Sequence, residues 1–335
     1  MEQNRKNLLK DLSERRGGKV LVYVTGDRPN LETVIHSEVV DKFLQHLDKI
    51  GNVKKIILVL HSKGGDITAA WSLTNLLRSF CDEFEVIIPA RAHSAATLIS
   101  LGAEKIIMTK QATLSPIDPS INTPLNPQIP NAPPGVNMPV SVEVINGFLQ
   151  LIEKEFKITG EEQKSEIMLN LMEKVHPLVL GNVYRTRNYI RMLAKKLLEK
   201  HLQDSAQVEK IINFLCSESS SHDYTINRKE ARDFLGLNIE KPDQEFYDNS
   251  IKPLYQDIQK ELLLNEPFSP VNVGKLEQEE PYEFRRGLIQ SLELGTDVFI
   301  SKGTIIKRQI QTPQGLQIQM TDNRSFEGWR EEYEL

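Results

Sequence analysis

Apolar runs and amphipathic segments alternate along the first third of the chain. Runs rich in apolar residues, four or five positions long, are typical of strands buried on both faces and occur at 20–24, 56–60, 84–88 and 105–108. Apolar positions spaced as on one face of a helix occur at 36–49, 68–79 and 95–101. Because strands that alternate with helices form βαβ units, the pattern predicts an α/β fold with a largely parallel sheet.

A proline-rich segment and then a helical region follow this alternating pattern. Residues 116–139 contain eight prolines, so neither a helix nor a central strand can run through them. We expect a long loop there, which is either a surface connection or a lid or wall of a substrate groove. Helical periodicity returns at 142–156, 163–175, 185–201, 208–216 and 227–235, with Asn227 as the cap of the last helix.

The pattern changes again after residue 240. A helix is expected at 251–264, followed by a joint rich in proline and glutamate at 265–281. Short alternating runs at 298–300, 304–306 and 315–320, separated by turn residues, predict a small antiparallel β appendage. The sequence thus predicts an N-terminal helix at 1–16, a main domain at 17–240 and a C-terminal helix and β appendage at 241–335.

Composition and charge narrow the class of protein. The 335 residues are 39% hydrophobic and 26% charged, with a net charge of −5, so nothing indicates a surface for nucleic acid. Two cysteines, Cys81 and Cys216, make neither a disulfide framework nor a metal cluster. The charged N-terminus lacks an apolar signal region, and no run approaches the ~20 apolar residues of a spanning helix. We therefore expect a cytoplasmic protein with no transmembrane segment and no metal.

Two strand ends carry the residue types that acyl-transfer chemistry uses. The strand at 56–60 runs into a Gly64-Gly65 turn, and the strand at 84–88 leads to Ser94 at the start of the helix at 95–101. Backbone N–H groups at a helix start and at a glycine turn can stabilise an oxyanion, while a serine hydroxyl can act as the nucleophile. Plainer interpretations exist, because Ser94 could be an N-cap and the glycines an ordinary turn.

These segments resemble the Clp-type fold of serine peptidases, which includes the Clp protease subunit and signal peptide peptidase A and is shared with the crotonases. A more specific resemblance is to the family of serine dehydrogenase proteinases. Its motifs span about residues 9–240 and read here RGGKVLVYVTGDR, LVLHSKGGD, ARAHSAATLISLGAEKIIM, LSPIDPS, HPLVLGNVYR and HDYTINRKEARDFLGLN. The resemblance implies a Clp/crotonase-type βαβ fold with helical additions, a peptide or protein substrate, and assembly into homo-oligomers.

The resemblance also implies roles for individual residues. Ser94 would be the nucleophile, and the backbone N–H groups of Gly65 and Ala95 would form the oxyanion hole, with Gly64 beside them. Asp223 falls at the position of the aspartate of the catalytic triad. The strand after the nucleophile helix, which carries the catalytic histidine in the Clp subunit, has no histidine here. The general base must therefore come from elsewhere or be absent.

Several side chains are candidates for the general base. His222 lies next to Asp223, although neighbours in an extended segment point to opposite sides, and a structural role for this imidazole is the plainer interpretation. Asp118 is another candidate, but a carboxylate is a weak base unless its pKa is raised, and this aspartate could simply form a turn. His93 has the same orientation problem beside Ser94, and Lys63 and Lys110 are candidates only by their proximity in sequence. His176, before Pro177, is expected to order a loop, and Asp66 to cap the helix that follows it.

We predict a cytoplasmic serine peptidase that forms an acyl-enzyme at Ser94 and requires no cofactor. The resemblance implies proteolysis that is ATP-independent or assisted by an unknown partner protein. The sequence contains no G-x-x-x-x-G-K-[ST] loop, which indicates no intrinsic ATPase. One alternative is a catalytically weak assembly or regulatory protein that retains the fold, which the missing histidine favours. A second is crotonase-like acyl-thioester chemistry, against which the A-x-S-A-A-T context of the serine argues.

Overall fold

A computed structural model describes residues 2–117, 120–133, 135–218, 224–269, 273, 275–312 and 315–332. The chain divides into two compact units. The first unit contains Met1–Thr113 together with Asn227–Leu335, and the second contains Leu114–Ile226. Two short strands, β6 (Thr113–Leu114) and β9 (Ile226–Asn227), contain the points where the chain passes from one unit to the other.

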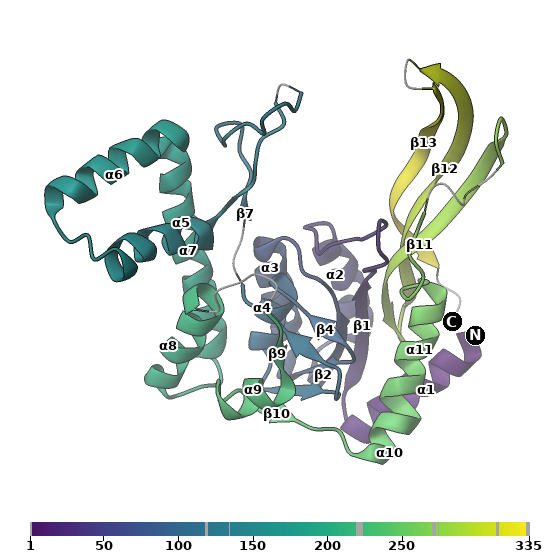
Figure 1. The fold of residues 1–335 in the computed structure, drawn as a ribbon. Helices are drawn as coiled ribbons and strands as arrows, with labels where there is room; N and C mark the ends of the chain where they lie inside the picture. The colour runs from purple at the N-terminus through teal and green to yellow at the C-terminus, as the bar shows by residue number, and fades with distance from the viewer. Residues whose placement is uncertain are drawn as a thin grey trace. The chain divides into compact units, whose positions relative to one another are not determined.

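The first unit is built on an eight-stranded sheet with the order β10-β5-β3-β2-β1-β11-β12-β13 (Figure 1). Its first five strands in this order are parallel, and the last three are antiparallel. The strands are β1 (Lys19–Thr25), β2 (Val53–His61), β3 (Cys81–Ile88), β5 (Lys105–Met108), β10 (Ile239–Glu240), β11 (Glu279–Ser291), β12 (Gly295–Thr312) and β13 (Gly315–Glu332). The α/β fold class predicted from the alternating pattern is confirmed.

Helices cover the two faces of this sheet. Alternate residues of β1 and β2 point to opposite sides, so Val22 and Ile57 join Leu254 in one buried cluster, while Tyr23 packs edge-to-face on Phe43 at 5.3 Å between ring centroids. The helices are α1 (Glu2–Arg16), α2 (Val39–Ile50), α3 (Ile67–Ser79), α4 (Ala95–Leu101), α9 (Arg228–Asp233), α10 (Gln244–Phe246), η3 (Tyr247–Ile251) and α11 (Lys252–Glu261). The bounds of α4 and β5 are those that the sequence predicts.

The C-terminal strands continue the central sheet, because β11 pairs antiparallel with β1 from Leu21–Ser291 to Thr25–Gly287. They are also much longer than the short runs expected from the sequence, and β11 begins in the last three residues of the segment expected to be a joint. Strand β13 is exposed along nearly its whole length, so it lacks the alternation of apolar and polar residues that marks a half-buried strand. Figure 1 shows β12 and β13 extending well beyond the parallel strands.

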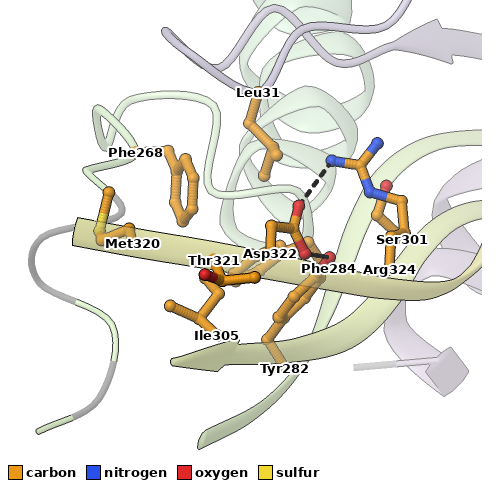
Figure 2. Close-up of a pocket in the computed structure, with 10 residues that line it drawn as sticks. All are labelled: Leu31, Phe268, Tyr282, Phe284, Ser301, Ile305, Met320, Thr321, Asp322 and Arg324. Carbon is orange, nitrogen blue, oxygen red and sulfur yellow. Dashed lines mark hydrogen bonds and ion pairs between the residues drawn. The ribbon is translucent and has the colours of Figure 1, made fainter. Parts of the chain in front are cut away.

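A small apolar cavity of about 190 Å³ lies among the C-terminal strands (Figure 2). Phe268 packs edge-to-face on Phe284 at 4.9 Å between ring centroids, and Phe284 stacks on Tyr282 at 4.6 Å. The Tyr282 hydroxyl donates a 2.7 Å hydrogen bond to Asp322, which also pairs with Arg324 at 3.1 Å. The aromatic rings thus give this part of the sheet a local core in addition to the main one.

A buried chain of serine, histidine and aspartate fastens α2 to β11 and β12. His46 Nδ1 lies 2.7 Å from Ser291 Oγ, and His46 Nε2 lies 3.1 Å from Asp297 Oδ2. Lys42 Nζ lies 3.0 Å from the second oxygen of Asp297. The connectivity is that of a catalytic triad, but all three members are at most 1% exposed, so no substrate can reach the hydroxyl. The network is therefore structural.

The second unit contains the proline-rich segment and most of the predicted helical region. The two-residue strands β7 (Ser120–Ile121) and β8 (Val140–Ser141) pair antiparallel, and the Asn126 amide bridges the two arms by donating to Ile121 O and Met138 O. The helices are α5 (Val142–Gln150), η1 (Leu151–Glu155), α6 (Glu161–Lys174), α7 (Pro177–Leu198), α8 (Ser205–Asn213) and η2 (Phe214–Glu218). As expected, neither a helix nor a central strand crosses the described part of residues 116–139.

Helix α7 begins eight residues earlier than the sequence predicts. Pro177 occupies the first turn, where a proline is favourable because its missing N–H would have no partner in the helix. The His176 ring caps the helix by accepting from the Leu178 N–H at 3.2 Å. His176 therefore orders the start of a helix, which agrees with its plainer interpretation.

Candidate active site

Ser94 occupies a sharp turn between β4 (Arg91–Ala92) and α4. Its backbone has φ 50° and ψ −114°, a conformation that non-glycine residues rarely adopt. Ser94 is the N-cap residue of α4, yet its side chain makes no capping hydrogen bond. The interpretation of this serine as an ordinary N-cap is therefore wrong, and a strained turn from strand to helix is the setting in which many hydrolases present their nucleophile.

The Gly64-Gly65 turn lies directly against Ser94. Ser62 follows β2 and pairs with the chain around β4, since its N–H donates to Arg91 O at 3.1 Å and its carbonyl accepts from the His93 N–H at 3.0 Å. A Cβ added to Gly64 would lie 2.9 Å from Ser94 Cβ and 3.1 Å from Ala95 N. With φ 107° and this close approach, only glycine fits at position 64.

The backbone donors at this point are not equivalent. The Gly64 N–H donates to Ser62 Oγ at 2.9 Å, so it is already occupied. Among the described residues, neither the Gly65 N–H nor the Ala95 N–H has a hydrogen-bond partner. Gly64, Gly65 and Ala95 thus lie in one short stretch of backbone around Ser94, and of their N–H groups only that of Gly64 has a partner among the described residues.

Ile35 holds the glycine turn from its other side. The Ile35 N–H donates to Gly64 O at 2.8 Å, and Ile35 O accepts from the Asp66 N–H at 2.8 Å. A Cβ on Gly65 would lie 2.3 Å from Ile35 O, which excludes any side chain there. These contacts fix the direction of the Gly65 peptide, and no local pattern around Ile35 predicts its part in them.

A buried group of polar side chains supports the same loops. His61, at the end of β2, has Nδ1 3.1 Å from the Tyr255 hydroxyl and Nε2 3.2 Å from Asp27 Oδ1, the latter contact lacking the alignment of a hydrogen bond. Asp27 also pairs with Arg91 at 3.0 Å. Burial alone would raise the pKa of Asp27, but His61 and Arg91 outweigh it and lower the pKa. The group ties the ends of β1 and β2 to β4, so it acts on the site through positioning.

None of the expected general bases is assigned by the geometry. Asp118, His222 and Asp223 lie outside the described residues. His93 directs Nε2 toward Thr113 Oγ1 at 2.8 Å, and Lys63 lies 3.8 Å from Glu32 on the surface. The Lys110 side chain is exposed. Asp66 caps α3 by accepting from the Ala69 N–H at 2.9 Å, as its plainer interpretation requires.

Comparison with known proteins identifies the family of the segment that carries this site. Residues 1–133 match the profile of the ClpP-like SDH-type serine proteinases, so the resemblance to this family is confirmed over those residues. The matched segment includes Gly64, Gly65, Ser94 and Ala95. Among the residues that the structure describes, no helix is long and apolar enough to cross a membrane.

Two proteins of Methanocaldococcus jannaschii are similar in sequence, and both are uncharacterized. MJ0137 is 25% identical over 242 residues, which are 70% of this chain and 73% of that protein. MJ1495 is 39% identical over 66 residues, which are 20% of this chain and 23% of that protein. These relatives extend the similarity beyond the family profile but supply no activity.

Two solved structures of the 1510-N membrane-bound stomatin-specific protease are also similar. A serine-to-alanine mutant is 14% identical with a TM-score of 0.39, and the match covers 62% of this chain and 75% of that chain. A lysine-to-alanine mutant in complex with a substrate peptide is 16% identical with a TM-score of 0.37, covering 62% and 70%. At these TM-scores the likeness carries no argument about individual residues.

Proposed function

We propose that this chain, whose residues 1–133 match the ClpP-like SDH-type serine proteinases, hydrolyses peptide bonds through an acyl-enzyme on Ser94. One observation carries the proposal. A serine held in a strained turn lies against a glycine turn, and two N–H groups without partners among the described residues, those of Gly65 and Ala95, belong to the same short stretch of backbone. A purely structural role for Ser94 would not explain the strain or the two donors.

The chemistry follows from these roles. Ser94 Oγ attacks the carbonyl carbon of the scissile bond while a general base takes its proton. The carbonyl oxygen becomes an oxyanion, which receives hydrogen bonds from the Gly65 and Ala95 N–H groups. Collapse of this intermediate expels the amine, which takes up a proton from the base, and leaves an ester on Ser94. Water then attacks the ester with the same base, releasing the acid and restoring the hydroxyl.

We further propose that Asp223 orients the general base. His222 is the first candidate for that base. Asp223→Asn keeps the shape of the side chain and removes its charge, a change that costs up to about 10⁴ in turnover in known triads. The measurement is the rate at which a fluorophosphonate probe labels the protein. If His222 is the base, His222→Gln should slow labelling as much as Asp223→Asn, because members of one catalytic unit are not additive.

The two variants separate the remaining possibilities. Normal labelling of His222→Gln, together with slow labelling of Asp223→Asn, would assign the base to another side chain such as Asp118 or a lysine. Normal labelling of both variants, with unchanged circular dichroism, would mean that the Clp-type triad does not carry over to this chain. Asp233→Asn is a matched control, because this exposed aspartate caps no helix and pairs with its neighbour Arg232.

We also propose that the active form is a homo-oligomer assembled through the second unit. Helix α6 buries none of its residues, and the small described core around α7 contains Val140, Val179 and Val183. Large apolar side chains remain exposed along the helices of this unit, at Val144, Phe148, Leu149, Leu151, Phe156, Leu169, Leu178, Tyr184, Tyr189 and Met192. So much exposed apolar surface is typical of an interface.

Light scattering coupled to gel filtration tests this assembly at micromolar concentration. We expect a mass that is a multiple of the 38.2 kDa chain. The double substitution Phe148→Asp/Phe156→Asp should shift the protein toward monomer, whereas Leu316→Asp/Ile318→Asp, at exposed apolar positions of β13, should not. A monomeric wild type, or dissociation caused only by the β13 variant, would contradict the proposal.

A further inference from the structure

A second cavity, which we call the Trp329 cavity, lies between the loop after β1 and the C-terminal strands. Its volume is about 380 Å³, enough for one long side chain of a ligand. It is lined by Glu32, Thr33, Val34, His36, Glu38, Arg286, Phe299, Glu327 and Trp329, all of which belong to the first unit.

Arg286, the cationic side chain that lines the Trp329 cavity, is fully occupied by partners within the protein. Arg286 Nη1 lies 2.8 Å from Ser301 Oγ and 2.9 Å from Glu327, and its other nitrogens donate to Leu31 O and Glu32 O. Glu327 is in turn neutralised by Arg286 and by Arg324. The charges of Arg286 and Glu327 therefore cancel, and neither side chain is available to bind a charged ligand.

Two carboxylates of the same cavity are not neutralised in this way. Glu38 is exposed and has no ion-pair partner among the described residues, and its side chain does not cap the helix that follows. The Glu32 carboxylate has a loose surface contact with Lys63 at 3.8 Å, a kind of pair that contributes little, and a longer-range attraction to Arg286, which Glu327 already pairs with. The cavity thus carries an excess of negative charge on its loop side.

Two of the residues that line the cavity are aromatic. Phe299 and Trp329 pack edge-to-face at 5.6 Å between ring centroids. The Arg286 guanidinium already lies 5.7 Å from the Phe299 ring, whereas no cation lies over the Trp329 indole among the residues that the structure describes. A cavity lined by both aromatic rings and carboxylates favours a cation with an apolar stem, which is the chemistry of a lysine or arginine side chain.

The loop that lines the Trp329 cavity is also the loop that holds the oxyanion turn. Ile35, whose backbone bonds to Gly64 and Asp66, lies between the lining residues Thr33, Val34 and His36. The lining residues Val34 and His36 are therefore the direct neighbours of the residue that holds the glycine turn.

We propose that the Trp329 cavity is a specificity subsite that binds a lysine or arginine side chain of the substrate, a few residues from the scissile bond. Glu32 and Glu38 supply the charge complementarity, and Trp329 contacts the stem and the cation. This inference rests on the proposed peptidase function and names a substrate class for it: extended peptides with a basic residue at a fixed distance from the cleaved bond.

The first test maps cleavage sites in reduced, carboxymethylated casein by mass spectrometry. Wild-type protein should show lysine and arginine enriched at one position relative to the cleaved bonds. Glu32→Gln/Glu38→Gln should lose that enrichment, whereas Glu161→Gln/Glu162→Gln, which changes the charge equally at exposed positions outside the cavity, should keep it. An enrichment that survives the first variant, or no enrichment in the wild type, overturns the subsite.

The second test measures binding without catalysis. Trp329 is the only tryptophan left in Ser94→Ala/Trp71→Phe, so its fluorescence can report on the cavity. A lysine-containing alanine peptide should bind about tenfold more tightly than the same peptide with norleucine, as expected for one cation–π contact with one ion pair. Adding Glu32→Gln/Glu38→Gln should abolish the difference, and equal affinities in the parent protein would contradict the subsite.

Different results would reject the peptidase function of Ser94 and the subsite at the Trp329 cavity. Labelling of Ser94 by a small fluorophosphonate does not involve the cavity, so the cavity variants should be labelled at the wild-type rate. Normal labelling without a preference for basic peptides rejects the subsite and leaves the peptidase intact. Preferential binding of the lysine peptide without any labelling of Ser94 rejects the peptidase function while retaining a site for basic side chains.

Discussion

Ser94→Ala is expected to abolish peptide hydrolysis while leaving the fold intact. Alanine removes the attacking oxygen, and loss of the nucleophile costs about 10⁶ in turnover in serine peptidases whose catalytic groups act as a unit. Since Ser94 makes no capping hydrogen bond, the helix loses little. The measurement is the release of soluble peptides from carboxymethylated casein, with circular dichroism and thermal unfolding recorded on the same samples.

Ser100→Ala is the matched control for this variant. Ser100 lies on the same helix, is buried, and donates its hydroxyl proton to Ala96 O at 2.9 Å within the helix. Its substitution should leave hydrolysis near the wild-type rate. Equal activity of Ser94→Ala and the wild type would contradict the assignment of the nucleophile, and would favour either the regulatory alternative or a contaminating peptidase.

Gly64→Ala is expected to reduce the rate of Ser94 acylation by about 10²- to 10³-fold, the cost of losing one oxyanion donor. Although the Gly64 N–H itself is occupied, a Cβ at this position would meet His93 O at 2.7 Å and Ser94 Cβ at 2.9 Å. The glycine turn must then move away from Ser94 and carry the Gly65 N–H with it. The measurement is the second-order rate of labelling by a fluorophosphonate probe.

Gly51→Ala separates this local effect from the general cost of replacing a glycine. Gly51 has φ 71°, so alanine is strained there too, but nothing lies within 4 Å of the added Cβ. It should lower the free energy of unfolding by about 1 kcal/mol and leave labelling unchanged. If both variants label equally fast, the contact between Gly64 and Ser94 does not support catalysis.

The sequence predicts the fold best where burial is most uniform. The strands that precede Ser94 and the glycine turn are buried on both faces, so their apolar runs leave little choice of structure. The start of α7 was mispredicted because Pro177 is favourable in a first turn but resembles a helix breaker in a sequence. The pairing of β11 with β1 was not predictable, since long-range register leaves no local signal.

Some features of the candidate site can likewise be predicted from the sequence, and others cannot. A serine after one strand and two glycines after another can be recognised in a sequence, as can their resemblance to a family. Which N–H groups stay without partners depends on contacts with distant residues, such as the hydroxyl of Ser62 on Gly64 and the backbone of Ile35. The Trp329 cavity joins residues 32–38 to residues 286–329, so its lining has no signature within any short segment.

Mass mapping after fluorophosphonate labelling tests the central claim most directly, because it reports nucleophilicity without knowledge of the substrate. The account predicts a single adduct on the peptide that carries Ser94, formed by the wild type and Ser100→Ala and absent from Ser94→Ala. A folded wild type that forms no adduct, or an adduct that persists in Ser94→Ala, would contradict the account.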